Sequence, residues 1–185
     1  MTDTLPTVIV LASGRGERFV ASGGSGSKLQ ALLAGQAVLA HTLAHVQASG
    51  LPWHLEDAGH PGMGDSIAAA VRNTPDAAGW LILPGDLPLV QPSTLRQVAA
   101  ALGGEAQAAQ PFFRGERGHP VGFARVNRES LMALQGNLGA APVLKALRAA
   151  GKVADIEVDD VGIVTDIDTL DALARAEALL LNPSR

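Results

Sequence analysis

One stretch of the sequence combines glycines with basic residues in a way that suits phosphate binding. It reads Ser13-Gly14-Arg15-Gly16-Glu17-Arg18, directly after an apolar run, and Lys28 follows further on. Glycines let backbone N–H groups approach an anion, and the basic side chains add positive charge. The stretch is neither a dinucleotide fingerprint, because Phe19 occupies the third glycine position, nor a Walker loop. It indicates a triphosphate cradle, with a flexible surface loop as the alternative.

Aspartates follow two other apolar runs and could bind a divalent metal. Asp86 lies in Pro-Gly-Asp-Leu-Pro, and Asp166 and Asp168 alternate with Ile167, which puts the two carboxylates on one side. Mg²⁺ is commonly held by one or two carboxylates together with substrate phosphates. We therefore predict Asp86 as the first ligand, completed by Asp166 or Asp168. The alternatives are an Asx turn at Asp86 and a helix cap at Asp168.

Two more motifs could contact a ligand. Gly62-Met63-Gly64-Asp65-Ser66 introduces a helix whose free N–H groups could face a substrate, with Asp65 or Ser66 as its cap. His119 follows a charged turn and is either a ligand of an acceptor phosphate or pterin, or an exposed turn residue.

The elements that must position these residues alternate between strands and helices. Apolar β-rich runs and turn signals predict strands over 7–12, 53–56, 80–83, 107–113, 119–124, 152–158 and 162–165. Helical spacing predicts helices over 37–48, 66–72, 92–102, 127–134, 140–150 and 170–181. Residues 13–28 show no periodicity and are predicted as a loop.

Such alternation predicts an α/β fold with a mostly parallel, doubly wound sheet. The strands at 107–113 and 119–124 would form a small antiparallel excursion from it. A length of 185 residues suits one domain, so we expect a single domain over 1–185. In such sheets the ligand binds at the carboxyl ends of the strands, where all three chemistry-bearing segments lie.

Composition excludes several classes of function. Aromatic residues make up 3% of the chain and the net charge is −4, which argues against a nucleic-acid surface. The absence of cysteine removes disulfides and thiolate chemistry and fits a reducing compartment. We see neither a secretory signal nor an apolar run near the roughly 20 residues needed to span a bilayer. The expectation is a cytoplasmic protein without a membrane partner.

Six motifs together resemble the molybdenum cofactor nucleotidyltransferases, the MobA-like NTP transferases, and most closely their molybdopterin cytidylyltransferase-like branch. They occur in the family's order over nearly the whole chain and read LASGRGERF with Lys28, GMGDS, PGDLP, GHPVGF, QGNLGAAPVL and TDIDTLDAL. The resemblance implies a Rossmann-like, three-layer nucleotidyltransferase fold. It also implies transfer of a nucleoside monophosphate from a triphosphate, with CTP favoured, to molybdopterin, with release of pyrophosphate.

The resemblance also implies roles for individual residues. Mg²⁺ would be held by Asp86 and Asp168, and catalysis would fall to Lys28, Arg18 and Asp86. The acceptor-binding residues would be His119 and Asn137. The predicted nucleotide-binding residues are Leu11, Ala12, Ser13, Gly14, Arg15, Gly16, Arg18, Lys28, Gly64 and Ser66.

The sequence departs from the family at three places. Residues 20–27 lengthen the first loop, the segment between Gly50 and Gly62 is short, and Asn137 stands where relatives often carry Asp. Two other readings therefore stay open. One is a nucleotidyltransferase for another small phosphate, such as a sugar phosphate. The other is a non-catalytic carrier that hands the cofactor to a molybdoenzyme client.

Overall fold

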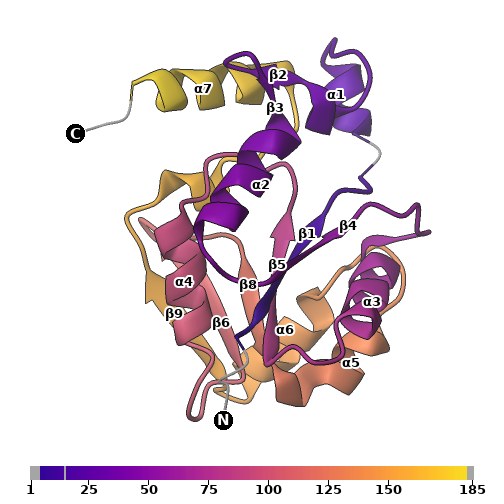
Figure 1. Cartoon of the computed structure of the whole chain (residues 1–185), viewed down its shortest axis with the longest axis vertical. Helices are drawn as coiled ribbons and strands as arrows, with labels where there is room; N and C mark the ends of the chain where they lie inside the picture. Colours follow the sequence, from indigo (N-terminus) through magenta and orange to yellow (C-terminus); the bar gives the residue numbers. More distant parts are fainter. Residues whose placement is uncertain (1–4, 15, 183–185) are drawn as a thin grey trace.

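The computed structural model describes residues 5–14 and 16–182, and its centre is one mixed sheet (Figure 1). The strands are β1 (Thr7–Leu11), β4 (Trp53–Glu56), β5 (Gly79–Pro84), β6 (Ala108–Phe113), β7 (Glu116–Arg117), β8 (Val121–Ala124) and β9 (Val153–Glu157). They run in the order β4-β1-β5-β8-β6-β7, and β9 pairs with β6. β1, β4 and β5 are mutually parallel, as are β6 and β9. The predicted mostly parallel α/β sheet is thus confirmed.

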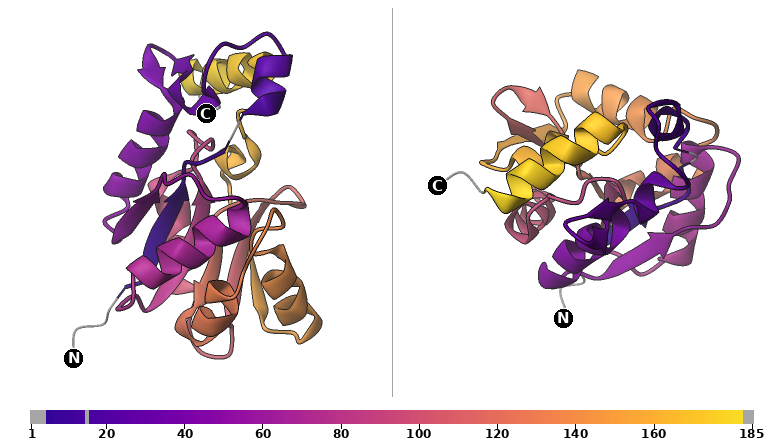
Figure 2. Two further views of the ribbon diagram at one scale, coloured as in Figure 1. Left: turned by 90° about the vertical axis from the view of Figure 1, so that its right-hand side faces the viewer. Right: turned by 90° about the horizontal axis from the view of Figure 1, so that it is seen from above.

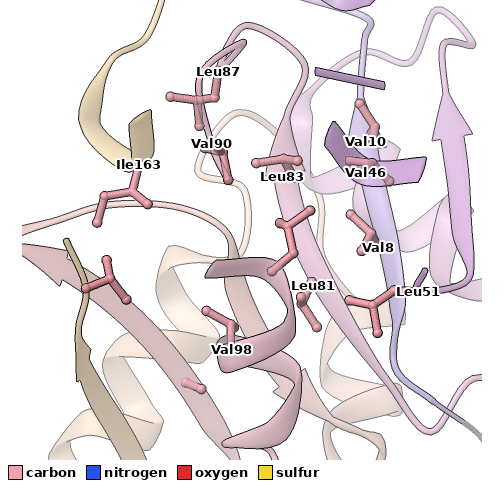
Figure 3. Packing of buried hydrophobic residues seen from close by; sticks show 13 residues of the cluster. Val8, Val10, Val46, Leu51, Leu81, Leu83, Leu87, Val90, Val98 and Ile163 are labelled. Atoms are coloured by element: carbon pink, nitrogen blue, oxygen red, sulfur yellow. The ribbon is translucent and has the colours of Figure 1, made fainter. Parts of the chain in front are cut away.

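Helices cover both faces of this sheet because consecutive strand residues point in opposite directions. Val8 and Val10 face α2 (Val38–Ala48) and α4 (Pro92–Ala100), in the cluster shown in Figure 3. Ile9 and Leu11 face the other way, toward α3 (Met63–Asn73), α5 (Arg128–Met132) and α6 (Ala141–Ala149). Four consecutive apolar residues of β1 are therefore buried on both faces, as expected for a central parallel strand.

A third group of elements lies beyond the carboxyl ends of β1 and β5 (Figures 1 and 2). Its members are α1 (Glu17–Ala21), the 3₁₀ turn η1 (Lys28–Gln30), the hairpin β2 (Leu32–Leu33) and β3 (Gln36–Ala37), and α7 (Leu170–Leu181). Phe19, Leu33, Ile167 and Ala176 form a small core there. This core brings the first loop next to residues 166–168, although the two segments are far apart in the sequence. Within the described ranges, no helix is long and apolar enough to cross a membrane.

Several local predictions need correction. Residues 13–28 contain the short helix α1, although that stretch was predicted as a loop. The strand β8 pairs antiparallel with β6, as predicted, but it lies inside the main sheet, between β5 and β6. The third helix begins at Met63, three residues before its predicted start, with Gly62 at its N-cap and no side-chain cap.

The predicted strand at 162–165 is wrong, because Val161–Val164 form a 3₁₀ turn, η3. Asp160, only 3% exposed, accepts a hydrogen bond from Gly162 N at 2.9 Å and so turns the chain. A Cβ on Gly162 would lie 2.2 Å from the Leu89 carbonyl oxygen, so the turn also depends on a close backbone approach. Asp160 further accepts from Gln91 N at 2.9 Å and from Thr94 Oγ1 at 2.6 Å, at the start of α4.

Replacing Asp160 by alanine should therefore destabilise the fold by about 2–3 kcal/mol, because buried donors lose their shared acceptor. The free energy of unfolding, measured by urea titration, checks this value. Asp159→Ala is the control, since Asp159 is the exposed neighbour and should change stability by less than about 0.5 kcal/mol. Equal losses in the two variants would contradict the prediction.

Candidate active site

The carboxyl ends of β1 and β5 are joined by a close backbone contact. Gly85 N donates to the Leu11 carbonyl at 2.8 Å, and a Cβ on Gly85 would lie 2.9 Å from that same oxygen. Only glycine fits such an approach without a shift of the backbone. This contact sets Asp86 beside the segment that follows β1.

Two further hydrogen bonds hold the turn that carries Asp86. The buried Thr42 hydroxyl, on α2, donates to the Gly85 carbonyl at 2.8 Å. Ile167 N donates to the Asp86 carbonyl at 3.0 Å, which ties residues 166–168 to the same turn. The two predicted metal aspartates are thereby held by backbone contacts, independently of what their carboxylates bind.

The Lys28 ammonium lies between these two carboxylates. Its Nζ is 2.5 Å from Asp86 Oδ2 and 2.6 Å from Asp168 Oδ1, and all three side chains are at most 18% exposed. Arg18 pairs with the other oxygen of Asp168 at 2.6 Å, from a side chain that is 81% exposed. The structure thus brings together Lys28, Arg18, Asp86 and Asp168, four of the residues that the sequence singled out.

The charges of this cluster shift the pKa values of Lys28 and Asp168. Burial disfavours the charged form of Lys28, but the nearby Asp86 and Asp168 carboxylates outweigh it and raise the pKa of Lys28 above its ordinary value. Partial burial likewise opposes the charge on Asp168, yet the hydrogen bond and charge of Lys28 lower the pKa of Asp168. Lys28 and Asp168 therefore stabilise each other's charged form.

Asp86 keeps one oxygen available for a ligand. Its Oδ1 is buried and has no hydrogen-bond partner within the described part of the chain, which is unfavourable unless something binds there. A carboxylate oxygen of this kind suits a hard divalent cation. The described residues contain no cluster of three or more His, Asp or Glu side chains placed to hold a metal. A cation here would need ligands from a substrate in addition to Asp86 and Asp168.

A pocket of about 410 Å³ opens on one side of the Lys28–Asp86 pair. Leu11, Ser13, Gly14, Lys28 and Ser66, all predicted to bind nucleotide, line it. Ser13 Oγ and Ser66 Oγ lie 3.2 Å apart and join the segment after β1 to α3.

The remaining predicted nucleotide-binding residues lie differently. Ala12 N donates to the Glu56 carbonyl, and Gly16 precedes α1 with a φ of 63°. Gly64 N donates to the Gly136 carbonyl at 2.7 Å, so this N–H is not free for a ligand. Arg15 lies outside the described residues.

A second pocket of about 430 Å³ lies on the other side of Lys28 and Asp86. His119, Arg18 and Asp168 line it, together with Arg117 and Asp166. Burial lowers the pKa of His119, which keeps its imidazole neutral.

The two predicted acceptor residues are separated in the structure. His119 lines the second pocket, whereas Asn137 lines the first, beside Gly14 and Ser66. The helix-cap alternative for Asp168 is not what the structure shows, since Thr169 Oγ1 accepts from Ala172 N and caps α7.

Arg117 and His60 are among the pocket residues that were not predicted from the sequence. Arg117 lies in the charged turn before His119, and the several charged residues of that turn could have indicated a binding residue there. His60 precedes the GMGDS motif and lines the first pocket, but an isolated loop histidine gave no local signal.

Fold and site together define an α/β class of protein that binds its ligands at the carboxyl ends of parallel strands. Residues 44–153 match the family model described as the MobA-like NTP transferase domain. The chain belongs to this family, and the match supports nucleotidyl transfer as its reaction class. The matched residues include Asp86, His119 and Asn137.

The chain is also similar to curated and solved proteins. It is 33% identical over 147 residues to the bifunctional protein GlmU of Stenotrophomonas maltophilia (strain R551-3), which covers 66% of this chain. The chain spans only 30% of the length of that relative.

Two solved structures share the fold. A nucleotidyl transferase from Methanothermobacter thermautotroptrophicus (Mth528) superposes with a TM-score of 0.80 at 21% identity, over 97% of this chain and 99% of its own. Rv0371C from Mycobacterium tuberculosis H37Rv, in complex with manganese, gives a TM-score of 0.70 at 23% identity, over 95% and 99% of the two chains.

Replacing Lys28 by methionine should destabilise the protein by about 2–3 kcal/mol, because two largely buried carboxylates lose their shared cation. The double variant Lys28→Met with Asp86→Asn should lose less than the sum of the single losses, since one of the unpaired charges is gone. Urea denaturation of all four proteins gives the coupling energy.

The exposed Lys145 provides the matched control, and Lys145→Met should change the free energy of unfolding by less than about 0.5 kcal/mol. Strictly additive losses for Lys28 and Asp86 would show that the pair contributes no coupling.

Proposed function

We propose that the protein transfers a nucleoside monophosphate, with CMP favoured, from a nucleoside triphosphate to a terminal phosphate of molybdopterin. The observation that carries this proposal is the Lys28 ammonium between Asp86 and Asp168, on the wall shared by two pockets. A cation flanked by two pockets can contact both substrates of a transfer reaction. CTP and molybdopterin come from the motif resemblance, and the family match supports the reaction class.

The first pocket would hold the triphosphate. It combines the segment after β1, which contributes Ser13 and Gly14, with Lys28 on one side and Ser66 on α3. Backbone N–H groups and the ammonium suit phosphate oxygens. We place Asn137 here as well, on the nucleotide side.

A divalent cation, which we propose to be Mg²⁺, would be held by Asp86 and Asp168 with substrate phosphate oxygens. Among the described residues, Asp86 Oδ1 has no hydrogen-bond partner and no group of three or more His, Asp or Glu side chains is placed to hold a metal, which supports such a shared ligand set. When bound, the cation would neutralise charge on the phosphates. The manganese complex of Rv0371C is consistent with divalent cation binding on this fold.

The second pocket would hold the acceptor, with Arg18 and Arg117 as phosphate-binding residues and His119 beside them. An oxygen of the acceptor phosphate attacks the α-phosphorus and forms a new P–O bond. The bond between that phosphorus and the oxygen leading to the β-phosphate breaks, and pyrophosphate leaves. A terminal phosphate is already an anionic nucleophile, so Lys28 and Arg18 need only align the substrates and stabilise the developing charge.

Pyrophosphate release tests this function directly. The protein is incubated with Mg²⁺, molybdopterin and each of CTP, GTP, ATP and UTP, and we expect release with CTP. Asp86→Asn should lower the rate at least about a hundredfold, as for removal of a major electrostatic group. Asp171→Asn, an exposed aspartate of α7, is the control and should keep the full rate.

Silence with all four triphosphates would overturn the transferase proposal and favour a carrier that delivers the cofactor to a molybdoenzyme. Release with a sugar phosphate in place of molybdopterin would keep the reaction class and replace the acceptor.

On the acceptor side, Arg117→Gln should raise the KM for molybdopterin about tenfold and leave the KM for CTP unchanged, because one charged hydrogen bond is lost. Steady-state kinetics with each substrate varied in turn separates the two constants. Arg148→Gln is a matched control, since Arg148 binds the same Asp155 carboxylate as Arg117 but does not line the pocket. Equal effects of both variants on the acceptor KM would assign the effect to Asp155 and not to the pocket.

A further inference from the structure

A buried carboxylate lies at the end of the edge strand β4, outside the cluster of Lys28, Asp86 and Asp168. Glu56 is 3% exposed and accepts three hydrogen bonds. They come from His54 Nε2 at 3.3 Å, His60 Nε2 at 3.1 Å and Ala58 N at 3.3 Å. A buried carboxylate is costly unless it is fully paired, so two half-buried histidines on one carboxylate are a specific arrangement.

The two histidines differ in what they face. His60 lines the first pocket together with Pro61 and Gly62, whereas His54 lies within β4 and does not line it. Since the Nε2 atom of His60 donates to Glu56, the second ring nitrogen, Nδ1, remains for a ligand. The Glu56 carboxylate therefore restricts the orientation of a histidine at the pocket wall.

The order of the strands places this histidine away from the cluster that would bind phosphate. β1 lies between β4 and β5 (Figure 1). In the register of these strands, Leu11 is next to Glu56 on one side and next to Pro84 on the other. Neighbouring strands are about 4.8 Å apart, so the ends of β4 and β5 are separated by about 10 Å. A triphosphate held at Lys28 and Asp86 would extend its nucleoside across the end of β1, toward His60.

We propose that His60 contacts the nucleoside of the bound triphosphate, and that Glu56 is a positioning residue that acts through His60. This inference rests on the proposed function. The imidazole offers one hydrogen bond to a ribose hydroxyl or to a polar group of the base, and it contributes nothing to the phosphates.

The first test compares a whole nucleotide with its phosphate chain alone. Isothermal titration calorimetry with Mg²⁺ measures the affinity for each of CTP, GTP, ATP and UTP and for inorganic tripolyphosphate. His60→Ala should weaken the best-bound nucleotide about tenfold and leave tripolyphosphate binding unchanged, because one hydrogen bond to the nucleoside is lost. His54→Ala removes the other histidine from Glu56 and should leave both affinities unchanged.

The second test asks whether Glu56 acts through His60. Glu56→Gln should weaken nucleotide binding about threefold in the wild-type background and cause no further loss in the His60→Ala background. A merely structural role would give the same loss in both backgrounds, which would overturn the assignment of Glu56 as a positioning residue.

The outcomes separate this inference from the proposed function. If the wild-type protein binds one of the four nucleotides and His60→Ala binds it equally well, the inference fails and the proposed function stands. If His60→Ala weakens tripolyphosphate as much as the nucleotide, His60 acts on the phosphates and the inference also fails. If the wild-type protein binds none of the four, both fail.

Discussion

The structure of the site depends on one interaction, the shared ion pair of Lys28 with Asp86 and Asp168. Two carboxylates this close repel each other unless a cation lies between them, and removing ions from water costs several kcal/mol each. The lysine offsets both costs only if both carboxylates lie within hydrogen-bonding distance of its ammonium. Lys28 lies in the segment after β1, Asp86 follows the end of β5, and Asp168 precedes α7. Asp86 and Asp168 are 58 and 140 residues from Lys28 along the chain.

Close backbone contacts fix the positions of the segments that carry these side chains. Gly85 packs against the Leu11 carbonyl, Gly162 against the Leu89 carbonyl, and Ile167 N donates to the Asp86 carbonyl. Each contact joins two segments through main-chain atoms, which hold position better than long side chains do. A close backbone contact of the same kind lies at the first pocket, where a Cβ on Gly62 would be 2.4 Å from the Gly136 carbonyl oxygen. The glycines of the motifs thus keep the site's walls close together, and the charged residues between them are placed as a result.

Periodicity predicted the central elements well because burial alone determines them. The predicted strands and helices match the structure within one residue at every boundary for the strands over 7–12, 53–56 and 80–83 and the helices over 37–48 and 170–181. Asp86 and Asp168, which the structure brings together at Lys28, were singled out because each follows an apolar run in the sequence. The turn at Val161–Val164 was missed because a buried Asp160 and a contact with Leu89 override an apolar run that reads as a strand. The place of His60 at the first pocket was not predicted, because its partner is the buried Glu56, whose burial no local pattern reveals.

The charges of the side chains that line the two pockets limit which anionic ligands can bind without an added cation. The second pocket is lined by Arg18, Lys28 and Arg117, against the four carboxylates of Asp86, Glu116, Asp166 and Asp168. The first is lined by Lys28 against Glu17 and Asp86. The lining carboxylates therefore outnumber the lining cations on both sides, and a ligand carrying several negative charges would be repelled by the side chains alone. Lys28 alone does not remove this deficit, because the same ammonium also pairs with Asp86 and Asp168. Under the proposed function, the triphosphate therefore binds together with a divalent cation, which adds positive charge to the site. That cation would be shared between the phosphates and Asp86 Oδ1, which has no partner among the described residues.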